Sequence, residues 1–198
     1  MYAGVIEAGC DEAGRGCLCG PVACAAVVLP DGFECEEIND SKQLAAGKRE
    51  ELAALIKAEA RAWSVVMVSP REIDEINILK ASIIGMHRAL DALDLKPAHI
   101  IVDGNRFSTY LDEEMRPVLH HTVVKGDAKY LSIAAASILA KTARDELMIR
   151  LAEEFPGYGW ERNMGYPTKE HLAALETLGV TPHHRLSYAP VKRLLQQG

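Results

Sequence analysis

The order of its apolar stretches constrains the fold of this 198-residue chain more than any other feature of the sequence. Residues 2–6, 22–29 and 60–68 have the length and apolar content of β-strands, and further short strands expected at 99–105 and 120–127 alternate with helical patterns. This order predicts an α/β fold: a mixed β-sheet, with an antiparallel meander followed by parallel strands, flanked by helices.

The helical patterns indicate where the interior lies. Residues 45–59 form an amphipathic pattern, and Ser69 followed by Pro70 is typical of a helix start, which predicts a helix continuing to residue 93. The segment 131–155 is apolar on nearly every side in its first half, so we expect it to run through the interior. Residues from about 160 to 198 predict a small C-terminal part of loops and two short helices.

Length and composition favour one domain. With 48% hydrophobic and 25% charged residues, the chain is long enough for one sizeable core, and we expect residues 1–198 to fold as a single domain. The first residues lack an export-signal pattern, and no apolar run approaches the ~20 residues that span a bilayer. We therefore expect a cytoplasmic protein that does not contact a membrane.

The cysteines do not indicate a disulfide framework. Their number is odd, and no pair has the CxxC spacing typical of zinc sites. We expect them to be small buried thiols. They are Cys10, Cys17, Cys19, Cys24 and Cys35.

The charge is unevenly distributed along the chain. Residues 1–124 hold 12 Lys and Arg against 20 Asp and Glu, whereas residues 125–198 hold 10 against 8. The basic C-terminal third is weak evidence for a polyanionic partner, because a solvated mixture of charges often differs by this much.

Acidic side chains lie near the ends of three of the predicted strands, namely Asp11 with Glu12, Asp103 and Asp127. Because ligands gather at the carboxyl ends of strands in such a sheet, we expect these acids to meet in one crevice. Converging carboxylates require a cation, and oxygen ligands without His or Cys favour Mg²⁺ or Mn²⁺, a pair of which commonly cleaves phosphodiesters. The alternative for each acid alone, above all for Asp127, is a turn former or helix cap.

Gly14, Arg15 and Gly16 follow the acidic pair directly. The glycines permit the backbone to bend and let a ligand approach its N–H groups, and an arginine can bind a phosphate with two donors. Taken alone, this short motif often indicates only a turn.

Six segments form a highly specific set: GCDEAGRGCLCGPV at 9–22, INDSKQL at 38–44, VDGN at 102–105, VVKGDAKYLSIAAASILAKTARD at 123–145, GYPTKEH at 165–171 and HHRLSYAPV at 183–191. In these segments the sequence resembles the ribonuclease HII family, over essentially the whole chain. The resemblance implies a ribonuclease H-like fold and a metal-dependent endonuclease. Its substrates would be RNA–DNA hybrids, cut in the RNA strand, and duplex DNA containing single ribonucleotides, as in ribonucleotide excision repair, with 3′-hydroxyl and 5′-phosphate ends left.

The resemblance also implies roles for individual residues. The four acids carry over as the catalytic and metal-binding set, and Gly14, Arg15 and Gly16 would read the ribose 2′-hydroxyl and the adjoining phosphate. Tyr166 would pack on the sugar at the RNA–DNA junction, although a half-buried loop aromatic is the alternative. Contacts to the nucleic-acid backbone are implied for Asn39, Ser41, Lys42, Lys125, Lys169, His184, Arg185 and Ser187. The alternative for each of them is a solvated surface residue that binds nothing.

Three positions invite a separate interpretation. Met164 stands where many relatives have a lysine, which would remove one phosphate contact, and Cys10 replaces a common valine. For Asp145 we favour an ion pair with Lys141, four residues earlier, over a contact with the second metal ion.

Two other functions stay open at this point: a metal-dependent DNA nuclease of related fold, and a hybrid-binding module without catalysis. The resemblance is to single-subunit bacterial enzymes, so we expect a monomer that requires no protein partner. We expect neither an additional N-terminal domain nor an aromatic clamp-binding motif in the tail that ends in Gln-Gln-Gly.

Overall fold

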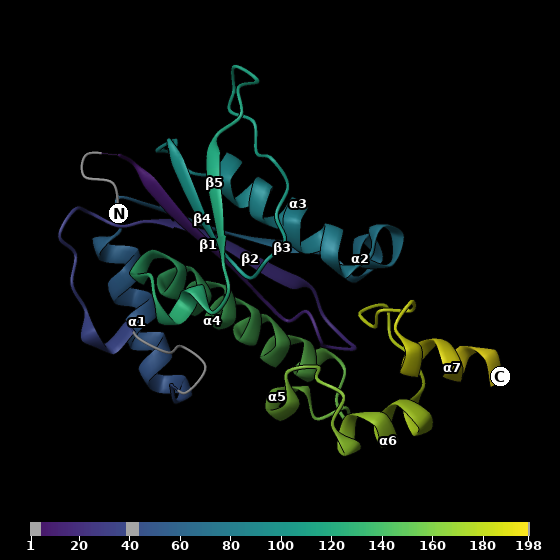
Figure 1. Ribbon diagram of the computed structural model, residues 1–198. Coiled ribbons are helices and arrows are strands. Elements are labelled where there is room, and N and C mark those ends of the chain that lie inside the picture. The colour runs from purple at the N-terminus through teal and green to yellow at the C-terminus, as the bar shows by residue number, and fades with distance from the viewer. Residues whose placement is uncertain (1–4, 39–43, 198) are drawn as a thin grey trace.

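The computed structural model describes residues 5–38 and 44–197, which contain one mixed five-stranded sheet with the order β3-β2-β1-β4-β5 (Figure 1). β1, β2 and β3 pair antiparallel, and β4 and β5 extend the sheet from β1 in parallel. The predicted fold class, an antiparallel meander followed by parallel strands, is confirmed. The strands are β1 Glu7–Ala13, β2 Val22–Val28, β3 Ala62–Val68, β4 His99–Asp103 and β5 Leu119–Val123.

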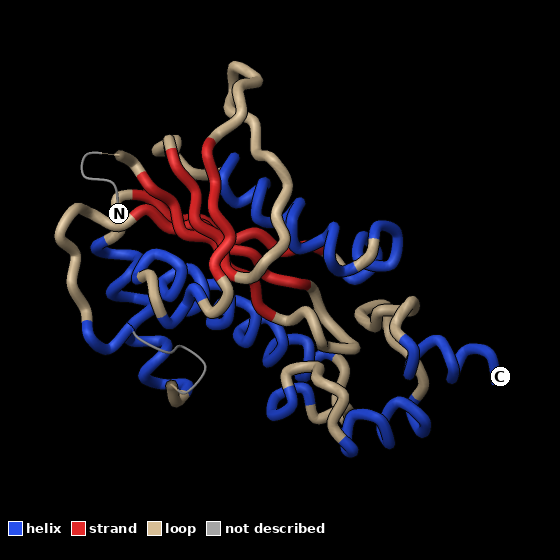
Figure 2. The backbone as a smooth tube through the Cα atoms, in the orientation of Figure 1, coloured by secondary structure: helices blue, strands red, loops and turns tan. Residues whose placement is uncertain are grey.

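Helices cover both faces of this sheet (Figure 2). On one face α3 packs against apolar side chains of β1, β2 and β4, and on the other face α4 packs against β1 and β2 and α1 packs against α4. This layered arrangement leaves the ends of the strands open. The helices up to residue 154 are α1 Ala46–Glu59, α2 Pro70–Ile76, α3 Ile78–Asp91 and α4 Leu131–Glu154, and the 3₁₀ turns are η1 Glu36–Ile38 and η2 Gly126–Ala128.

The first strand begins later than predicted. It runs from Glu7 to Ala13 and therefore contains Asp11 and Glu12, which we had expected to lie beyond its end. Its polar side chains are tolerated because they have partners: the Glu7 carboxylate lies 2.8 Å from Nδ1 of His99, the first residue of β4.

The long helix predicted from residue 70 is two helices. Ser69 caps α2 as expected, because its hydroxyl accepts a hydrogen bond from the Glu72 amide. Asn77 then adopts a positive φ of 69°, and its side-chain oxygen accepts hydrogen bonds from the Leu79 and Lys80 amides. Asn77 thus ends α2 and caps α3.

α4 lies unusually close to β1, which places its side chains next to the strand end. A Cβ atom added at Gly9 would lie 2.2 Å from the carbonyl carbon of Ser132, so only glycine fits there. In the first half of α4 every residue from Ser132 to Ala140 is buried, as the apolar sequence predicted, and these residues include Ala134, Ala135 and Ala136. The short alanine side chains permit this close contact with the sheet.

The C-terminal part contains three helices, one more than predicted: α5 Trp160–Asn163, α6 Lys169–Leu178 and α7 Ala189–Gln197. Trp160 is fully buried and stacks on Tyr158, with ring centroids 4.8 Å apart. Their cluster includes Met148 and Leu151 of α4, which attaches this part to the rest of the fold.

The five cysteines are free thiols, and all except Cys35 are buried, as the sequence predicted. Cys10 lies in the core beneath α3, where burial raises the pKa of its thiol. In the described part of the chain, no helix has both the length and the apolar character needed to cross a membrane.

Candidate active site

Two of the predicted acids lie on neighbouring parallel strands. Cys10 of β1 is in register with Val102 of β4, so Asp11 and Asp103 follow side by side at the same edge of the sheet. Asp11 is only 3% exposed. Burial raises the pKa of its carboxyl well above the usual range, and the negative charges of Glu12 and Asp103 raise it further, against a lowering by the hydrogen bond from Ser137. The Asp11 and Asp103 carboxyl groups are therefore close enough to interact.

Asp127 lies in η2, directly after a residue that contacts Asp103. The Gly126 amide donates a hydrogen bond of 2.7 Å to Oδ1 of Asp103, and Asp127 is buried. Lys125, with φ of 55°, makes the left-handed turn between β5 and η2. The chain thus brings Asp127 back toward the ends of β1 and β4.

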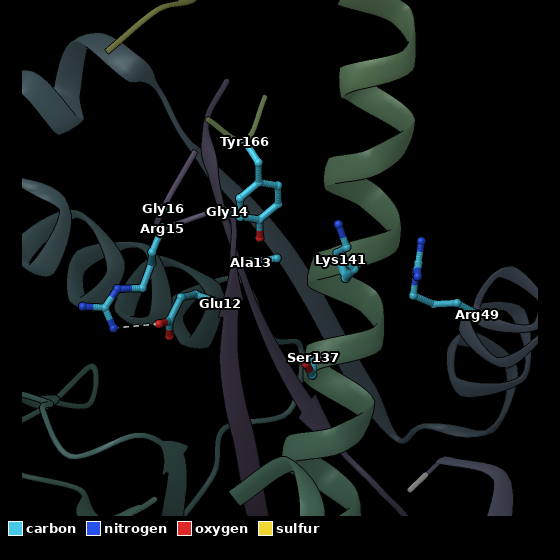
Figure 3. A pocket seen from close by; sticks show the side chains of 9 residues that line it. All are labelled: Glu12, Ala13, Gly14, Arg15, Gly16, Arg49, Ser137, Lys141 and Tyr166. Atoms are coloured by element: carbon cyan, nitrogen blue, oxygen red, sulfur yellow. Dashed lines mark hydrogen bonds and ion pairs between the residues drawn. The ribbon is translucent and has the colours of Figure 1, made fainter. Parts of the chain in front are cut away.

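Glu12 follows Asp11 in β1, and its negative charge raises the pKa of the Asp11 carboxyl. Its carboxylate pairs with the Arg15 guanidinium at 3.1 Å (Figure 3), and its amide donates to Oδ1 of Asp11 at 2.7 Å. Glu12 also lines a small cavity of about 60 Å³ together with Asp103. The structure therefore brings the four predicted acids to one edge of the sheet.

The donor chemistry of this edge fits a hard divalent cation. In residues 5–38 and 44–197, no three Asp, Glu, His or Cys side chains already form a metal-binding arrangement. However, the carboxyl groups are oxygen donors, and the raised pKa of Asp11 reflects its burial and then the repulsion by Glu12 and Asp103, both of which a bound cation would offset. The residues that would hold such an ion are Asp11, Glu12, Asp103 and Asp127.

A larger cavity of about 400 Å³ adjoins Glu12. The turn of Gly14, Arg15 and Gly16 lines it together with Tyr166, and Figure 3 shows Lys141 and Ser137 of α4 on the opposite side. Gly14 has φ of 94°, and an added Cβ atom would collide with the Arg144 side chain, so glycine is required there. Arg15 and Gly16 are the exposed residues of the turn, and both line the cavity.

Tyr166 is 41% exposed, and its ring lies 5.8 Å from Nζ of Lys141. Burial of the rest of the side chain raises the pKa of its hydroxyl, with a further contribution from the Cys17 thiol, to which it is hydrogen bonded. Its backbone is fixed because its carbonyl accepts hydrogen bonds from the Thr168 amide at 2.8 Å and from Nδ1 of His171 at 2.9 Å. A neutral aromatic ring is thus held at the cavity.

The remaining predicted contacts differ in where the structure places them. Asn39, Ser41 and Lys42 lie outside the described residues. Lys125 and Lys169 are exposed, which suits contact with a polyanion. Ser187 is exposed as well.

His184 and Arg185 are placed differently from what we expected. His184 is 1% exposed and Arg185 is 0% exposed. Their polar atoms are bound to other protein groups, His184 to Thr181 and His171, and Arg185 to backbone carbonyls. Because a buried, hydrogen-bonded side chain does not reach a nucleic-acid backbone, we leave both residues out of the proposed contact surface.

The cavity also contains residues that we had not selected. Ser137, Lys141 and Arg49 line it, and Asp145 joins two of them: its carboxylate is 2.7 Å from Lys141 and 2.7 Å from Arg49. The ion pair between Lys141 and Asp145, predicted from their spacing, is confirmed. Arg49 gave no comparable signal, since its partner is 96 residues away.

Met164 contributes its backbone rather than its side chain. Its carbonyl accepts a hydrogen bond of 2.8 Å from the Arg144 guanidinium, and its side chain packs on the cluster around Trp160. The departure from lysine therefore leaves an apolar contact at this position.

Comparisons with known proteins agree with this geometry. The family described as Ribonuclease HII matches residues 8–191. Ribonuclease HII of Parabacteroides distasonis is 57% identical over 198 residues, which cover 100% of this chain and 97% of that protein. The crystal structure of ribonuclease H2 from Pyrococcus horikoshii matches with a TM-score of 0.81 at 26% identity, covering 96% of this chain and 97% of that one.

A second solved structure is the PCNA:RNase HII complex from Archaeoglobus fulgidus, with a TM-score of 0.76 at 30% identity, covering 93% of this chain and 95% of that one. Sequence, fold and site geometry agree over nearly the full length. The chain therefore belongs to the ribonuclease HII family of metal-dependent endonucleases.

Proposed function

We propose that this protein hydrolyses the RNA strand of RNA–DNA hybrids and nicks duplex DNA on the 5′ side of embedded ribonucleotides, leaving 3′-hydroxyl and 5′-phosphate ends. The observation that carries the proposal is the position of buried Asp11 beside Asp103, next to a cavity lined by Gly14, Arg15, Gly16 and Tyr166. A set of carboxylates thus adjoins a surface suited to a sugar and a phosphate.

The acids would bind divalent ions on either side of the scissile phosphate. Two Mg²⁺ or Mn²⁺ ions, when bound, would supply an activated water and stabilise the charge that develops on the departing 3′-oxygen. Asp11, Glu12, Asp103 and Asp127 would hold and orient them. Asp11 is the most buried of the four, so its carboxylate gains most from a cation.

Recognition of RNA would come from the adjoining cavity. The amide of Gly16, an exposed residue, and the Arg15 side chain would bind the ribose 2′-hydroxyl and the adjoining phosphate, and the Tyr166 ring would pack on the sugar. The 2′-hydroxyl is the only group that distinguishes RNA from DNA at a single nucleotide, apart from the thymine methyl. A small set of fixed backbone donors suits this task.

Further contacts with the nucleic-acid backbone would come from Lys125 and Lys169, which are exposed, and from Asn39, Ser41 and Lys42. Ser187 would contribute its exposed surface. We propose that the protein acts as a monomer, since the four acids and the cavity come from a single chain.

The test uses a DNA duplex with one ribonucleotide, an RNA–DNA hybrid and an all-DNA duplex, each incubated with Mg²⁺, Mn²⁺ or chelator. We expect metal-dependent cuts in the first two substrates only. Asp103→Asn should abolish cutting and retain hybrid binding, because the amide oxygen can still accept the Gly126 hydrogen bond. Asp94→Asn, at an exposed acid, is the matched control.

Two results would contradict the proposal. Cleavage of the all-DNA duplex would favour a DNA nuclease, and hybrid binding without any metal-dependent nick would favour a binding module. Full turnover by Asp103→Asn in Mg²⁺ would refute the role of that carboxylate.

A further inference from the structure

The Gly14–Arg15–Gly16 turn is bound from its buried side by two residues near the C-terminus. The Arg185 guanidinium donates hydrogen bonds to the carbonyl of Gly14 at 2.7 Å, to that of Arg15 at 2.8 Å and to that of Gly20 at 3.0 Å. The Tyr188 hydroxyl donates to the same Arg15 carbonyl at 2.6 Å and accepts from Arg185 at 3.0 Å. One guanidinium and one hydroxyl therefore fix two successive peptide groups of the turn.

Arg185 is fully buried, and its guanidinium donates hydrogen bonds to carbonyls and a hydroxyl. Burial lowers the pKa of its guanidinium, which reflects the cost of removing the charge from water. Hydrogen bonds from a charged donor are stronger than neutral ones, so the carbonyls are held firmly. The guanidinium also has the geometry to bind several fixed carbonyls at once, which an ammonium lacks.

The orientation of the carbonyls determines the orientation of the amides. In a trans peptide group the C=O and N–H bonds point in opposite directions, and this chain has no cis peptide bonds among its described residues. The carbonyls of Gly14 and Arg15 point toward Arg185, so the N–H groups of Arg15 and Gly16 point away from it. Gly16 is exposed, and all three residues of the turn line the 400 Å³ cavity.

We propose that Arg185 and Tyr188 are positioning residues for ribose recognition. By binding the carbonyls of Gly14 and Arg15, they aim the amides of Arg15 and Gly16 at the 2′-hydroxyl and the adjoining phosphate. The inference rests on the proposed function and assigns to these two residues the fixing of its recognition element. They touch the turn and not the substrate.

The two residues between Arg185 and Tyr188 are hydrogen bonded to α2. The Asp74 carboxylate of α2 accepts hydrogen bonds from the Leu186 amide at 2.8 Å, from the Ser187 amide at 2.9 Å and from the Ser187 hydroxyl at 2.6 Å. The residues between Arg185 and Tyr188 are thus fixed by α2. This anchor keeps the guanidinium in place behind the turn.

The experiment measures cleavage of a duplex with one ribonucleotide in Mg²⁺, together with inhibition of that reaction by an all-DNA duplex of the same sequence. Tyr188→Phe removes only the hydroxyl, and Arg185→Lys tests the guanidinium. Tyr158→Phe is the matched control, because its hydroxyl donates to the Gly179 carbonyl at 2.9 Å, far from the turn in sequence and outside the cavity lining. Thermal melting of each variant accompanies the kinetics.

For Tyr188→Phe we expect kcat/KM to fall about 3- to 10-fold, as for the loss of one hydrogen bond, with the inhibition constant of the all-DNA duplex unchanged. Arg185→Lys should lose more, and Tyr158→Phe should change neither value even where its Tm falls. Should Arg185→Lys fail to fold, Tyr188→Phe still decides the matter.

The inference is overturned if Tyr188→Phe retains the wild-type kcat/KM, or if kcat/KM and DNA inhibition weaken by the same factor, since the loss would then not concern the ribose. A wild-type protein that does not nick the ribonucleotide-containing duplex would instead overturn the proposed function, and this inference with it. The two failures are thereby distinguishable.

Discussion

Acid should destabilise this protein through His184. The imidazole is buried in a hydrogen-bonded network in which Nδ1 accepts from the Thr181 amide at 2.9 Å and Nε2 lies 3.2 Å from Nε2 of His171. That His171 nitrogen also accepts from the Trp160 indole at 3.0 Å, while its Nδ1 binds the Tyr166 carbonyl. The bonds are mutually consistent only when both rings are neutral, because a proton on Nδ1 of His184 would face the Thr181 N–H group.

The magnitude follows from the pKa. Burial, and then the neighbouring His171, lower the pKa of His184 from 6.5 to about 4. Between these values the unfolded chain binds a proton that the folded protein does not, so the stabilising contribution is complete above pH 6.5 and is lost as the pH falls toward 4. At about 1.4 kcal/mol per pKa unit, the loss is about 3 kcal/mol, or about 6 to 12 °C in Tm for a domain of this size.

The assay is urea unfolding of the wild type and of His184→Asn between pH 8 and pH 4. The asparagine oxygen can still accept from the Thr181 amide, and the residue does not titrate. The variant should therefore be less stable at pH 8 but lose about 3 kcal/mol less than the wild type on acidification.

His183→Asn, at the half-exposed neighbouring residue, is the control and should follow the wild-type curve. Equal losses of stability in the wild type and in His184→Asn would refute the reasoning, because the acid sensitivity would then arise elsewhere.

Other substitutions, and the addition of a metal ion, test separate contacts. Gly9→Ala should lower the free energy of unfolding, measured in urea, by about 2 kcal/mol or more, because the new Cβ atom would lie 2.2 Å from the α4 backbone. Gly47→Ala is the matched control: it has open space around it in α1 and should raise the same free energy by about 0.5 to 1 kcal/mol. Asp145→Asn should cost about 3 kcal/mol in thermal unfolding, because it weakens two ion pairs of 2.7 Å at a nearly buried carboxylate, and wild-type stability would contradict this. Added Mg²⁺ or Mn²⁺ should raise the Tm of the wild type and raise that of Asp103→Asn less; equal rises would exclude that carboxylate as a ligand.

The sequence predicted those elements whose side chains are all of one kind. β2 is buried at every residue, and its apolar run predicted it within one residue. β1 was misplaced because Glu7, Asp11 and Glu12 are poor strand residues on their own. Their partners, among them His99 on β4, come from distant parts of the chain, and no local pattern reveals them.

The break between α2 and α3 had a signal that we did not use. Asn77 is both tolerant of a positive φ and a good helix cap, so an asparagine inside a long helical pattern is a possible boundary. For the candidate site, the strand ends predicted where the four acids lie, but residue types did not predict whether a basic side chain points outward. His184 and Arg185 have the same chemistry buried as exposed, and only the fold determines their direction.

Two buried arginines, Arg144 and Arg185, explain how the cavity of about 400 Å³ can be built from distant segments. Arg144 of α4 donates to the carbonyls of Cys19 at 2.9 Å and Pro21 at 2.9 Å, and also to that of Met164, two residues before Tyr166. It therefore fixes the segment after the glycine turn relative to the tyrosine loop, while Arg185 fixes the turn itself. Distinguishing a hydroxyl from a hydrogen requires that these groups be placed within about 0.5 Å. Each guanidinium is costly to bury, and replacing either by an apolar residue would leave three carbonyls without these donors. The stability of the cavity and the ribose selectivity that we propose for it thus depend on the same hydrogen bonds.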